Sequence, residues 1–307
     1  MSVPILSARS IVKSFAGRAW FGGAGNAKRA VDDVDLDVHE GETLAIVGES
    51  GSGKSTLARI LLGLIKPSAG DVAFDGRSVD AFKAPDWATF RKAVQPIFQD
   101  PASSLNPRMR VDTTLSNVLL RHGLATRHTL EPMINELLAS VGLDAAQFHD
   151  RYPHQLSGGQ QQRVAIARAM AVRPRLIIAD EPLSSLDMSV QAQILDLLDS
   201  LKSSHKLGLV LISHDLNVVD AISDRVIVMY LGKIVEAGPT RQVLGNPASD
   251  YTRSLLAAKL VADPHLARAR RLAMDAAIAS APKSGPELQS RTSKPDLPKP
   301  DLPGALQ

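Results

Sequence analysis

The 307-residue chain contains no cysteine, so it forms no disulfide and supplies no thiolate to a zinc or iron–sulfur centre. It also lacks an apolar run close to the roughly 18 residues that a transmembrane helix needs. Its first residues do not combine a basic stretch with a long apolar one, as a secretory leader does. These absences favour a soluble, cytoplasmic protein and are compatible with a reducing compartment.

Neither sign of charge dominates the sequence. The 35 lysines and arginines are interspersed with 32 aspartates and glutamates, which gives a net charge of only +3. Because nucleic-acid binding is favoured by concentrated basic charge, we expect no nucleic-acid partner. With 44% apolar residues, the chain can bury the core of one large domain or of two.

The first third of the sequence predicts a strand, a glycine loop and a helix. Apolar and acidic residues alternate over residues 33–38, which is the period-two pattern of a half-exposed strand. Residues 43–47 form a continuous apolar strand, and residues 55–64 form a helix that must end before Pro67. The glycines lie between this second strand and the helix.

Helical spacing of apolar residues, interrupted by proline and glycine, predicts an inserted helical subdomain at about residues 100–173. Its last helix begins at the motif LSGGQ, residues 156–160. The apolar positions that define the earlier helices are Leu115, Val118, Leu119, Ile134, Leu137, Leu138 and Val141.

Two further buried strands are predicted at residues 176–179 and 209–212, with a helix between them. Residues 226–230 and 233–237 flank a Leu-Gly turn and are predicted to form a terminal hairpin. This alternation of strands and helices predicts an α/β fold with a mostly parallel sheet. The core stripe of the intervening helix is Val190, Ile194, Leu197, Leu198 and Leu201.

The composition changes near the end of the chain. An Ala/Arg-rich helical stretch is followed by a proline-dense segment in which KPDLP occurs at residues 294–298 and again at 299–303. We therefore expect one domain over residues 1–262 and an extension over 263–307 that is extended and disordered from about residue 281.

The stretch GESGSGKST fits the phosphate-loop pattern G-x-x-x-x-G-K-[ST]. Backbone N–H groups of such a loop surround phosphates, Lys54 reaches the β and γ phosphates, and the Ser55 hydroxyl can ligate Mg²⁺. The alternative is a chance glycine-rich turn, which the buried strand before it and the helix after it make improbable. The loop consists of Gly48, Glu49, Ser50, Gly51, Ser52, Gly53, Lys54, Ser55 and Thr56.

Two acids stand at the carboxyl end of the strand in LIIADEP, residues 176–182, where open α/β sheets bind their ligands. Asp180 suits Mg²⁺, and Glu181 can polarise an attacking water. The alternative is a solvated acidic pair. His214 also follows a buried strand; alone, such a histidine is more often structural, and only its place at the same sheet edge favours a catalytic role.

The LSGGQ motif has glycines but no lysine. Ser157 and Gln160 fit a helix capping box, and Gly158 and Gly159 expose N–H groups at the helix N-terminus. The helix dipole there contributes only about 0.3–1 kcal/mol to anion binding. This second anion site therefore cannot hold ATP unaided.

Six motifs occur here in the order found in ATP-binding cassette ATPases: GESGSGKST, FQDP, LSGGQ, LIIADEP, SSLD at residues 184–187, and ISHD. The chain resembles that family over roughly residues 3–260. The resemblance implies a P-loop NTPase fold with a mostly parallel sheet, an antiparallel β subdomain and an inserted helical subdomain. It also implies hydrolysis of ATP with Mg²⁺, coupled to transport across a membrane.

The resemblance assigns roles that the residues alone do not. It implies that Gln99 contacts the metal and the attacking water, that His214 contacts the γ-phosphate, and that Asp187 lies at a dimer seam. The LSGGQ loop would close over ATP held by the phosphate loop of the opposite subunit, so that two ATP molecules are sandwiched between two chains.

The resemblance also implies an aromatic side chain that stacks on adenine. Phe15, near the first strand, is the best candidate. Trp20 and Phe21 are alternatives that lie in a glycine-rich insertion.

A narrower resemblance concerns the transported solute. Residues 29–34, 99–109 and 246–256 are similar to the ATPases of dipeptide and oligopeptide importers, notably the second of their two paired ATPases. The chain departs from that pattern at residues 249–250, which are Ser-Asp in place of His-Pro, and in having no cysteine-rich C-terminal segment. Nickel, glutathione and opine importers share these motifs, and an exporter is a further alternative.

The resemblance implies partners that this chain does not contain. These are two transmembrane permease subunits, a second ABC ATPase that is identical or paralogous, and, indirectly, an extracytoplasmic solute-binding protein. The chain would then be peripheral, at the cytoplasmic face of the cell membrane. Chromosome-maintenance and translation-associated cassette proteins are disfavoured, since the chain has neither a long coiled-coil insertion nor a second LSGGQ.

Overall fold

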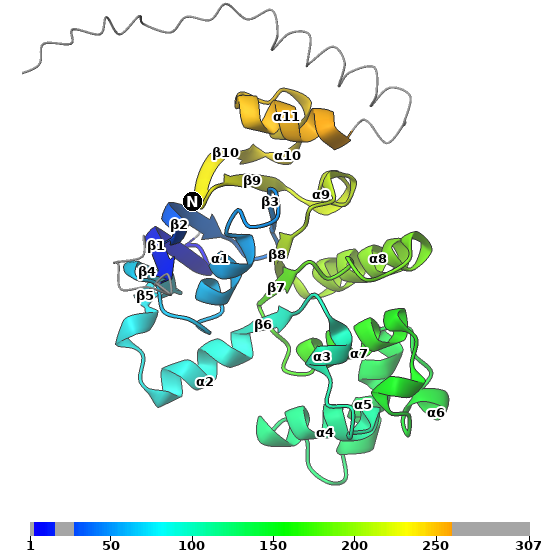
Figure 1. The fold of residues 1–307 in the computed structure, drawn as a ribbon. Coiled ribbons are helices and arrows are strands. Elements are labelled where there is room, and N and C mark those ends of the chain that lie inside the picture. The colour runs from blue at the N-terminus through cyan, green and yellow to red at the C-terminus, as the bar shows by residue number, and fades with distance from the viewer. Residues whose placement is uncertain (1–2, 16–27, 260–307) are drawn as a thin grey trace, which may run out of the picture. The chain divides into compact units, whose positions relative to one another are not determined.

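A computed structural model describes residues 3–15 and 28–259 of the chain (Figure 1). The strands are β1 (Leu6–Phe15), β2 (Lys28–Val38), β3 (Thr43–Val47), β4 (Ala69–Phe74), β5 (Arg77–Ser78), β6 (Val94–Ile97), β7 (Leu176–Asp180), β8 (Gly208–Ile212), β9 (Arg225–Tyr230) and β10 (Lys233–Pro239). The α-helices are α1 (Lys54–Leu61), α2 (Ala84–Ala93), α3 (Pro101–Ser104), α4 (Val111–Arg121), α5 (Leu130–Ser140), α6 (Ala145–Phe148), α7 (Gly158–Met170), α8 (Met188–His205), α9 (Leu216–Ile222), α10 (Thr240–Gly245) and α11 (Asp250–Lys259).

Six strands form the central sheet, in the order β10-β9-β3-β8-β7-β6. All neighbours in it are parallel except β10, which pairs antiparallel with β9 at one edge. Ile212 of β8 lies opposite both Ile46 of β3 and Asp180 of β7. The carboxyl ends of these three strands therefore meet at one edge, as expected for parallel strands.

Both faces of this sheet are covered. Ile177 and Leu209 face a core shared with helices α4, α5, α7 and α8, whereas their neighbours Ile178 and Val210 face a core shared with α1 and the second sheet. Burial on both sides explains why β3, β7 and β8 read as continuous apolar runs instead of alternating ones.

The second sheet is antiparallel, with strand order β2-β1-β4-β5. Beside it, the edge-to-face aromatic rings of Phe74, Phe82, Trp87 and Phe90 join β4 to α2. This sheet places Phe15, the last residue of β1, and Ala30 of β2 beside the glycine loop that follows β3.

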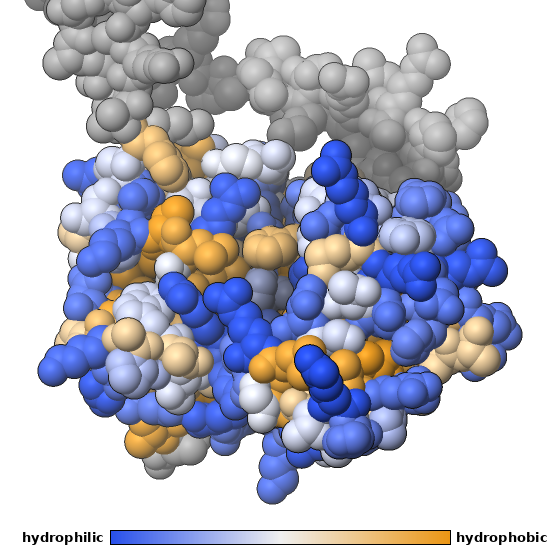
Figure 2. Space-filling view, turned by 90° about the horizontal axis from the view of Figure 1, so that it is seen from below, coloured by the Kyte–Doolittle hydropathy of each residue, from blue (hydrophilic) through white to orange (hydrophobic). Residues whose placement is uncertain are grey.

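The surface drawn in Figure 2 is mostly polar, which agrees with the burial of apolar side chains in these cores. Figure 2 shows hydrophilic side chains over most of the face seen from below, with apolar residues gathered in separate patches between them.

Most predicted elements are confirmed, with two refinements. Helix α1 ends at Leu61, three residues before the predicted end, because Gly63 has a φ of 65° and closes the helix with a left-handed turn. In α8 the stripe residues Ile194, Leu198 and Leu201 are buried, whereas Val190 and Leu197 are partly buried. Trp20, Phe21 and the proline-rich tail lie outside the described residues, and the domain boundary at residue 262 stays a prediction.

Candidate active site

The phosphate loop between β3 and α1 is packed tightly against two strands. A Cβ atom on Gly48, whose φ is 148°, would lie 2.1 Å from the carbonyl oxygen of Met229 in β9. A Cβ atom on Gly53, whose φ is 107°, would lie 2.1 Å from the carbonyl oxygen of Ala30 in β2. These two glycines are therefore required by backbone conformation and by space.

Lys54 is buried, with 5% of its surface exposed, at the first position of α1. Its Nζ atom donates to the carbonyl oxygens of Gly48, at 2.7 Å, and Glu49, at 2.8 Å. Burial lowers the pKa of Lys54, and the nearby carboxylates of Glu181 and Asp180 oppose that shift. The loop thus holds a desolvated cation that an anionic ligand would stabilise.

Ser55 and Asp180 meet across the site. The Ser55 hydroxyl donates to Oδ1 of Asp180 at 2.9 Å. Burial raises the pKa of Asp180, while this hydrogen bond acts in the opposite direction. A hydroxyl, a carboxylate and the nearby amide oxygen of Gln99 are the hard oxygen donors that Mg²⁺ takes in proteins, so the side chains fit a magnesium ion.

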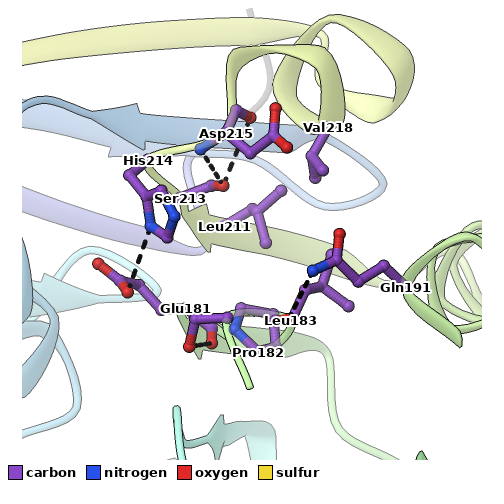
Figure 3. Close-up of a pocket in the computed structure, with 10 residues that line it drawn as sticks. Glu181, Pro182, Leu183, Gln191, Leu211, Ser213, His214, Asp215 and Val218 are labelled. Atoms are coloured by element: carbon purple, nitrogen blue, oxygen red, sulfur yellow. Dashed lines mark hydrogen bonds and ion pairs between the residues drawn. The ribbon is translucent and has the colours of Figure 1, made fainter. Parts of the chain in front are cut away.

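Two predicted site residues, Gln99 and His214, converge on a third, Glu181. Its Oε2 atom accepts a hydrogen bond from Gln99 Nε2 at 3.2 Å. The same oxygen lies 3.4 Å from His214 Nδ1, a contact that Figure 3 shows. The Glu181 backbone has a φ of 47°, which is unusual for a residue with a side chain, and its N–H donates to the carbonyl oxygen of Ile212. The backbone of Glu181 is therefore strained at the end of β7, as is frequent at functional sites.

A cleft of about 440 Å³ opens above the phosphate loop. Its size falls within the range of small-molecule sites. Phe15 lines it with its ring half exposed, and Lys13 Nζ lies 5.5 Å from the ring centroid. The other predicted site residues that line the cleft are Ser50, Gly51, Gly53, Lys54, Ser55, Thr56, Gln99 and Glu181.

A smaller cavity of about 70 Å³ adjoins Glu181 and His214 (Figure 3). Gln191 of α8 lies at its edge, and its amide donates to the carbonyl oxygens of Leu183 and Leu186. These bonds hold the loop that leads to Asp187, which is exposed and immediately precedes α8.

The LSGGQ loop is capped as the sequence predicts. Ser157 Oγ accepts from the N–H of Gln160, and Gln160 Oε1 accepts from the N–H of Ser157. A Cβ atom on Gly159 would lie 2.5 Å from Val190 Cγ1, and one on Gly158 would lie 3.3 Å from Leu186. The glycines therefore also permit close packing on the loop and helix next to Asp187, a reason that sequence reasoning missed.

Sequence reasoning also missed two side chains that brace the site. Tyr251 of α11 accepts a hydrogen bond from the backbone N–H of Glu49 in the phosphate loop. The partly buried guanidinium of Arg168 in α7 donates to the carbonyl oxygen of Ser104, the last residue of the short helix α3 that follows Gln99. The only sequence signal for Tyr251 was its place in the importer-like stretch 246–256.

A family model described as ABC transporter matches residues 31–184. The oligopeptide transport ATP-binding protein OppF of Salmonella typhimurium is 45% identical over 257 residues, which cover 83% of this chain and 77% of OppF. The glutathione import ATP-binding protein GsiA of Salmonella paratyphi A is 45% identical over 278 residues, which cover 90% of this chain but 44% of GsiA. Among solved structures, the dimeric ATP-binding cassette MJ0796 bound to ADP and phosphate has a TM-score of 0.66 and 30% identity, over 77% of this chain and 99% of that one.

The phosphate loop, the acids at the end of β7 and these similarities place the chain in the ABC transporter family. It is an ATP-hydrolysing subunit of that family, with the fold that the motifs predicted. In the part of the chain that the structure describes, no helix is both long and apolar enough to cross a membrane.

Proposed function

We propose that this chain powers the import of short peptides, as one of two ATPases that bind two permease subunits at the cytoplasmic face of the cell membrane. The observation that carries the ATPase half of this proposal is the convergence of Gln99 and His214 on Glu181, beside the Ser55–Asp180 pair. Gln99, Glu181 and His214 follow the ends of β6, β7 and β8, and Gln99, Glu181 and Ser55 line the cleft above the phosphate loop.

In this proposal Lys54 leaves its two carbonyl partners to bind the β and γ phosphates of ATP. Ser55, Asp180 and Gln99 would hold Mg²⁺, which would neutralise phosphate charge when bound. Glu181 accepts a proton from the attacking water, and His214 contacts the γ-phosphate while its imidazole keeps Glu181 in place. Phe15 supports the adenine ring on its exposed face.

The LSGGQ loop acts on the ATP of the opposite subunit in this proposal. Ser157 is exposed at the N-terminus of α7, and Asp187 is exposed at the start of α8 beside it. Moving a dimer from about 1:99 to 99:1 closed needs roughly 5.5 kcal/mol of preference for the closed state. In this proposal two γ-phosphates, each held from both sides, supply that preference, and hydrolysis removes it.

The proposal that the transported solute is a peptide rests on sequence similarity. OppF, whose name describes oligopeptide transport, is similar over 77% of its length, and residues 99–109 and 246–256 carry the importer-like patterns. GsiA, whose name describes glutathione import, is equally similar in sequence, so a glutathione-like tripeptide is the second candidate. An extracytoplasmic binding protein would deliver the solute to the permeases.

Uptake by cells tests the substrate class. A strain that lacks the gene is complemented with the wild-type protein or with the Glu181→Gln variant, and uptake of labelled di-, tri- and pentapeptides, glutathione and Ni²⁺ is measured. We expect the wild-type protein alone to restore peptide uptake. Restoration of Ni²⁺ uptake without any effect on peptides would contradict the peptide assignment.

A further inference from the structure

The phosphate loop is held from outside the nucleotide cleft by the C-terminal elements of the domain. In the turn between β9 and β10, the N–H of Gly232 donates to the carbonyl oxygen of Ser52 at 2.9 Å. The carbonyl oxygen of Gly232 in turn accepts from the N–H of Asp32, also at 2.9 Å. The loop therefore rests on the hairpin as well as on its own flanking elements.

Tyr251 supplies the second external contact. Its Oη atom accepts the backbone N–H of Glu49 at 3.2 Å, across 202 residues of sequence. The carbonyl oxygen of the same residue, Glu49, accepts a hydrogen bond from Lys54 Nζ. Both polar backbone atoms of Glu49 are thus engaged, one by α11 and the other by the lysine that would bind phosphate.

The position of Tyr251 is fixed independently of the loop. Glu236 of β10 accepts the N–H groups of Ala248 and Ser249, just before α11, at 2.8 and 3.1 Å. The Tyr251 ring packs on Tyr230 at the end of β9, with 4.3 Å between the ring centroids. Leu255 and Leu256 continue this contact and pack on the core formed by β3, β9 and α9.

From these contacts we infer that Tyr251 is a positioning residue for nucleotide binding, which couples the placement of α11 to the conformation of the phosphate loop. This inference rests on the proposed role of the loop in binding ATP. With the Tyr251 hydroxyl in place, the backbone of Glu49 is held, and with it the conformation of the phosphate loop that would surround the phosphates. Without it, the Glu49 N–H turns to water and the competent loop conformation loses population, so apparent nucleotide affinity falls by the same fraction.

The test removes one hydroxyl at a time. Tyr251→Phe keeps the ring contact with Tyr230 but loses the acceptor for Glu49, and Tyr230→Phe is the matched control from the same ring pair. One net hydrogen bond corresponds to about a 2- to 10-fold change in equilibrium. We expect Tyr251→Phe to raise the Kd and KM for MgATP by about that factor, with kcat and nucleotide-free Tm close to wild type, and we expect Tyr230→Phe to change none of them.

Three outcomes would overturn the inference. The first is an unchanged MgATP Kd in Tyr251→Phe while the wild-type protein binds ATP. The second is an equal loss of affinity in Tyr230→Phe, which would indicate a general effect of the ring pair. The third is unaltered ATP binding by Lys54→Ala, measured in parallel, which would refute the phosphate-loop site itself and with it any positioning role for Tyr251.

Discussion

The Ser55 hydroxyl donates a hydrogen bond to Oδ1 of Asp180 at 2.9 Å, which links the start of α1 to the end of β7 across 125 residues of sequence. The bond brings together two oxygen donors suited to one magnesium ion. Burial raises the pKa of the Asp180 carboxyl and the neighbouring Glu181 carboxylate adds to this shift, whereas the Ser55 hydrogen bond and the cations of Arg59 and Lys54 oppose it.

This relationship predicts that Asp180→Asn stabilises the nucleotide-free protein near pH 7 while it impairs MgATP binding. The pKa of Asp180 is higher in the folded than in the unfolded state, so its favourable contribution exists below the unfolded value near 3.8 and is lost as pH rises through the folded value. Asparagine still accepts from Ser55 but never becomes charged.

Thermal unfolding of both proteins between pH 7 and pH 4 checks this prediction. The Tm advantage of Asp180→Asn should be largest at pH 7 and should shrink as pH falls toward 4, because wild-type Asp180 then becomes protonated. A Tm difference that is constant over this range would show that the charge of Asp180 is not the cause.

Replacement of the buried cation should disable the site. Lys54→Ala removes the charge that would pair with the phosphates, and we expect hydrolysis to fall by at least about a hundredfold, because hydrogen bonds to charged groups contribute about 1.5–3 kcal/mol each. Lys66→Ala is the matched control, since its side chain is 80% exposed and pairs with Asp80. Steady-state phosphate release measures both variants, and equal activity in the two would contradict the assignment.

Glu181→Gln should separate binding from hydrolysis. The glutamine keeps a side-chain oxygen for Gln99 but cannot accept a proton from water, so we expect about a 10²- to 10⁴-fold loss of hydrolysis with ATP affinity retained. Size-exclusion chromatography with MgATP should show the variant accumulating as a closed dimer. If it stayed monomeric under conditions in which the wild-type protein dimerises, the role of Glu181 would need revision.

Phe15 offers a test of base recognition. Phe15→Leu keeps an apolar surface but removes the aromatic face, and we expect the KM for ATP to rise about three- to tenfold with kcat unchanged, because aromatic pairs contribute about 0.5–1.5 kcal/mol beyond their area. The measurement compares KM for ATP with KM for triphosphate, which has no base. A fall in affinity for both ligands would place Phe15 outside the adenine site.

The sequence predicts the central sheet well because β3, β7 and β8 are buried on both faces and their polar site residues follow them directly. It does not predict β1 or β6. In β1 the alternation of buried residues breaks between Ala8 and Ile11, where Ser10 has a φ of 47° and the pairing shifts register. Strand β6 lies at the sheet edge and contains Pro96, a residue that argues against a strand when only the sequence is read.

In the candidate site, too, some features could be predicted from the sequence and others could not. Residues 48–56 carry their chemistry in a local pattern, so they could be assigned from the sequence. The contact between Tyr251 and Glu49 depends on how α11 packs against β9 and β10, and no local pattern encodes a bond over 202 residues. The packing of Gly159 against Val190 could not be predicted either, because no local sequence pattern encodes it.

The claim that the LSGGQ loop acts on the neighbouring subunit is tested most directly by mixing two inactive proteins, Lys54→Ala and Ser157→Arg. In a mixed dimer one of the two sites then combines an intact phosphate loop with an intact LSGGQ loop. Random pairing at a 1:1 ratio therefore leaves about a quarter of all sites intact.

If the native partner is a different ATPase, Ser157→Arg should disable the partner's site. Nucleotide crosslinking to each phosphate loop then reports which of the two sites has failed.

The decisive measurement is ATP hydrolysis by the 1:1 mixture, with co-purification of a tagged chain to show that mixed dimers form. The trans arrangement predicts recovery to as much as about a quarter of wild-type activity, from two proteins that are each inactive alone. Mixed dimers that form but show no recovered hydrolysis would mean that both loops serve the ATP of their own chain, and would contradict the account.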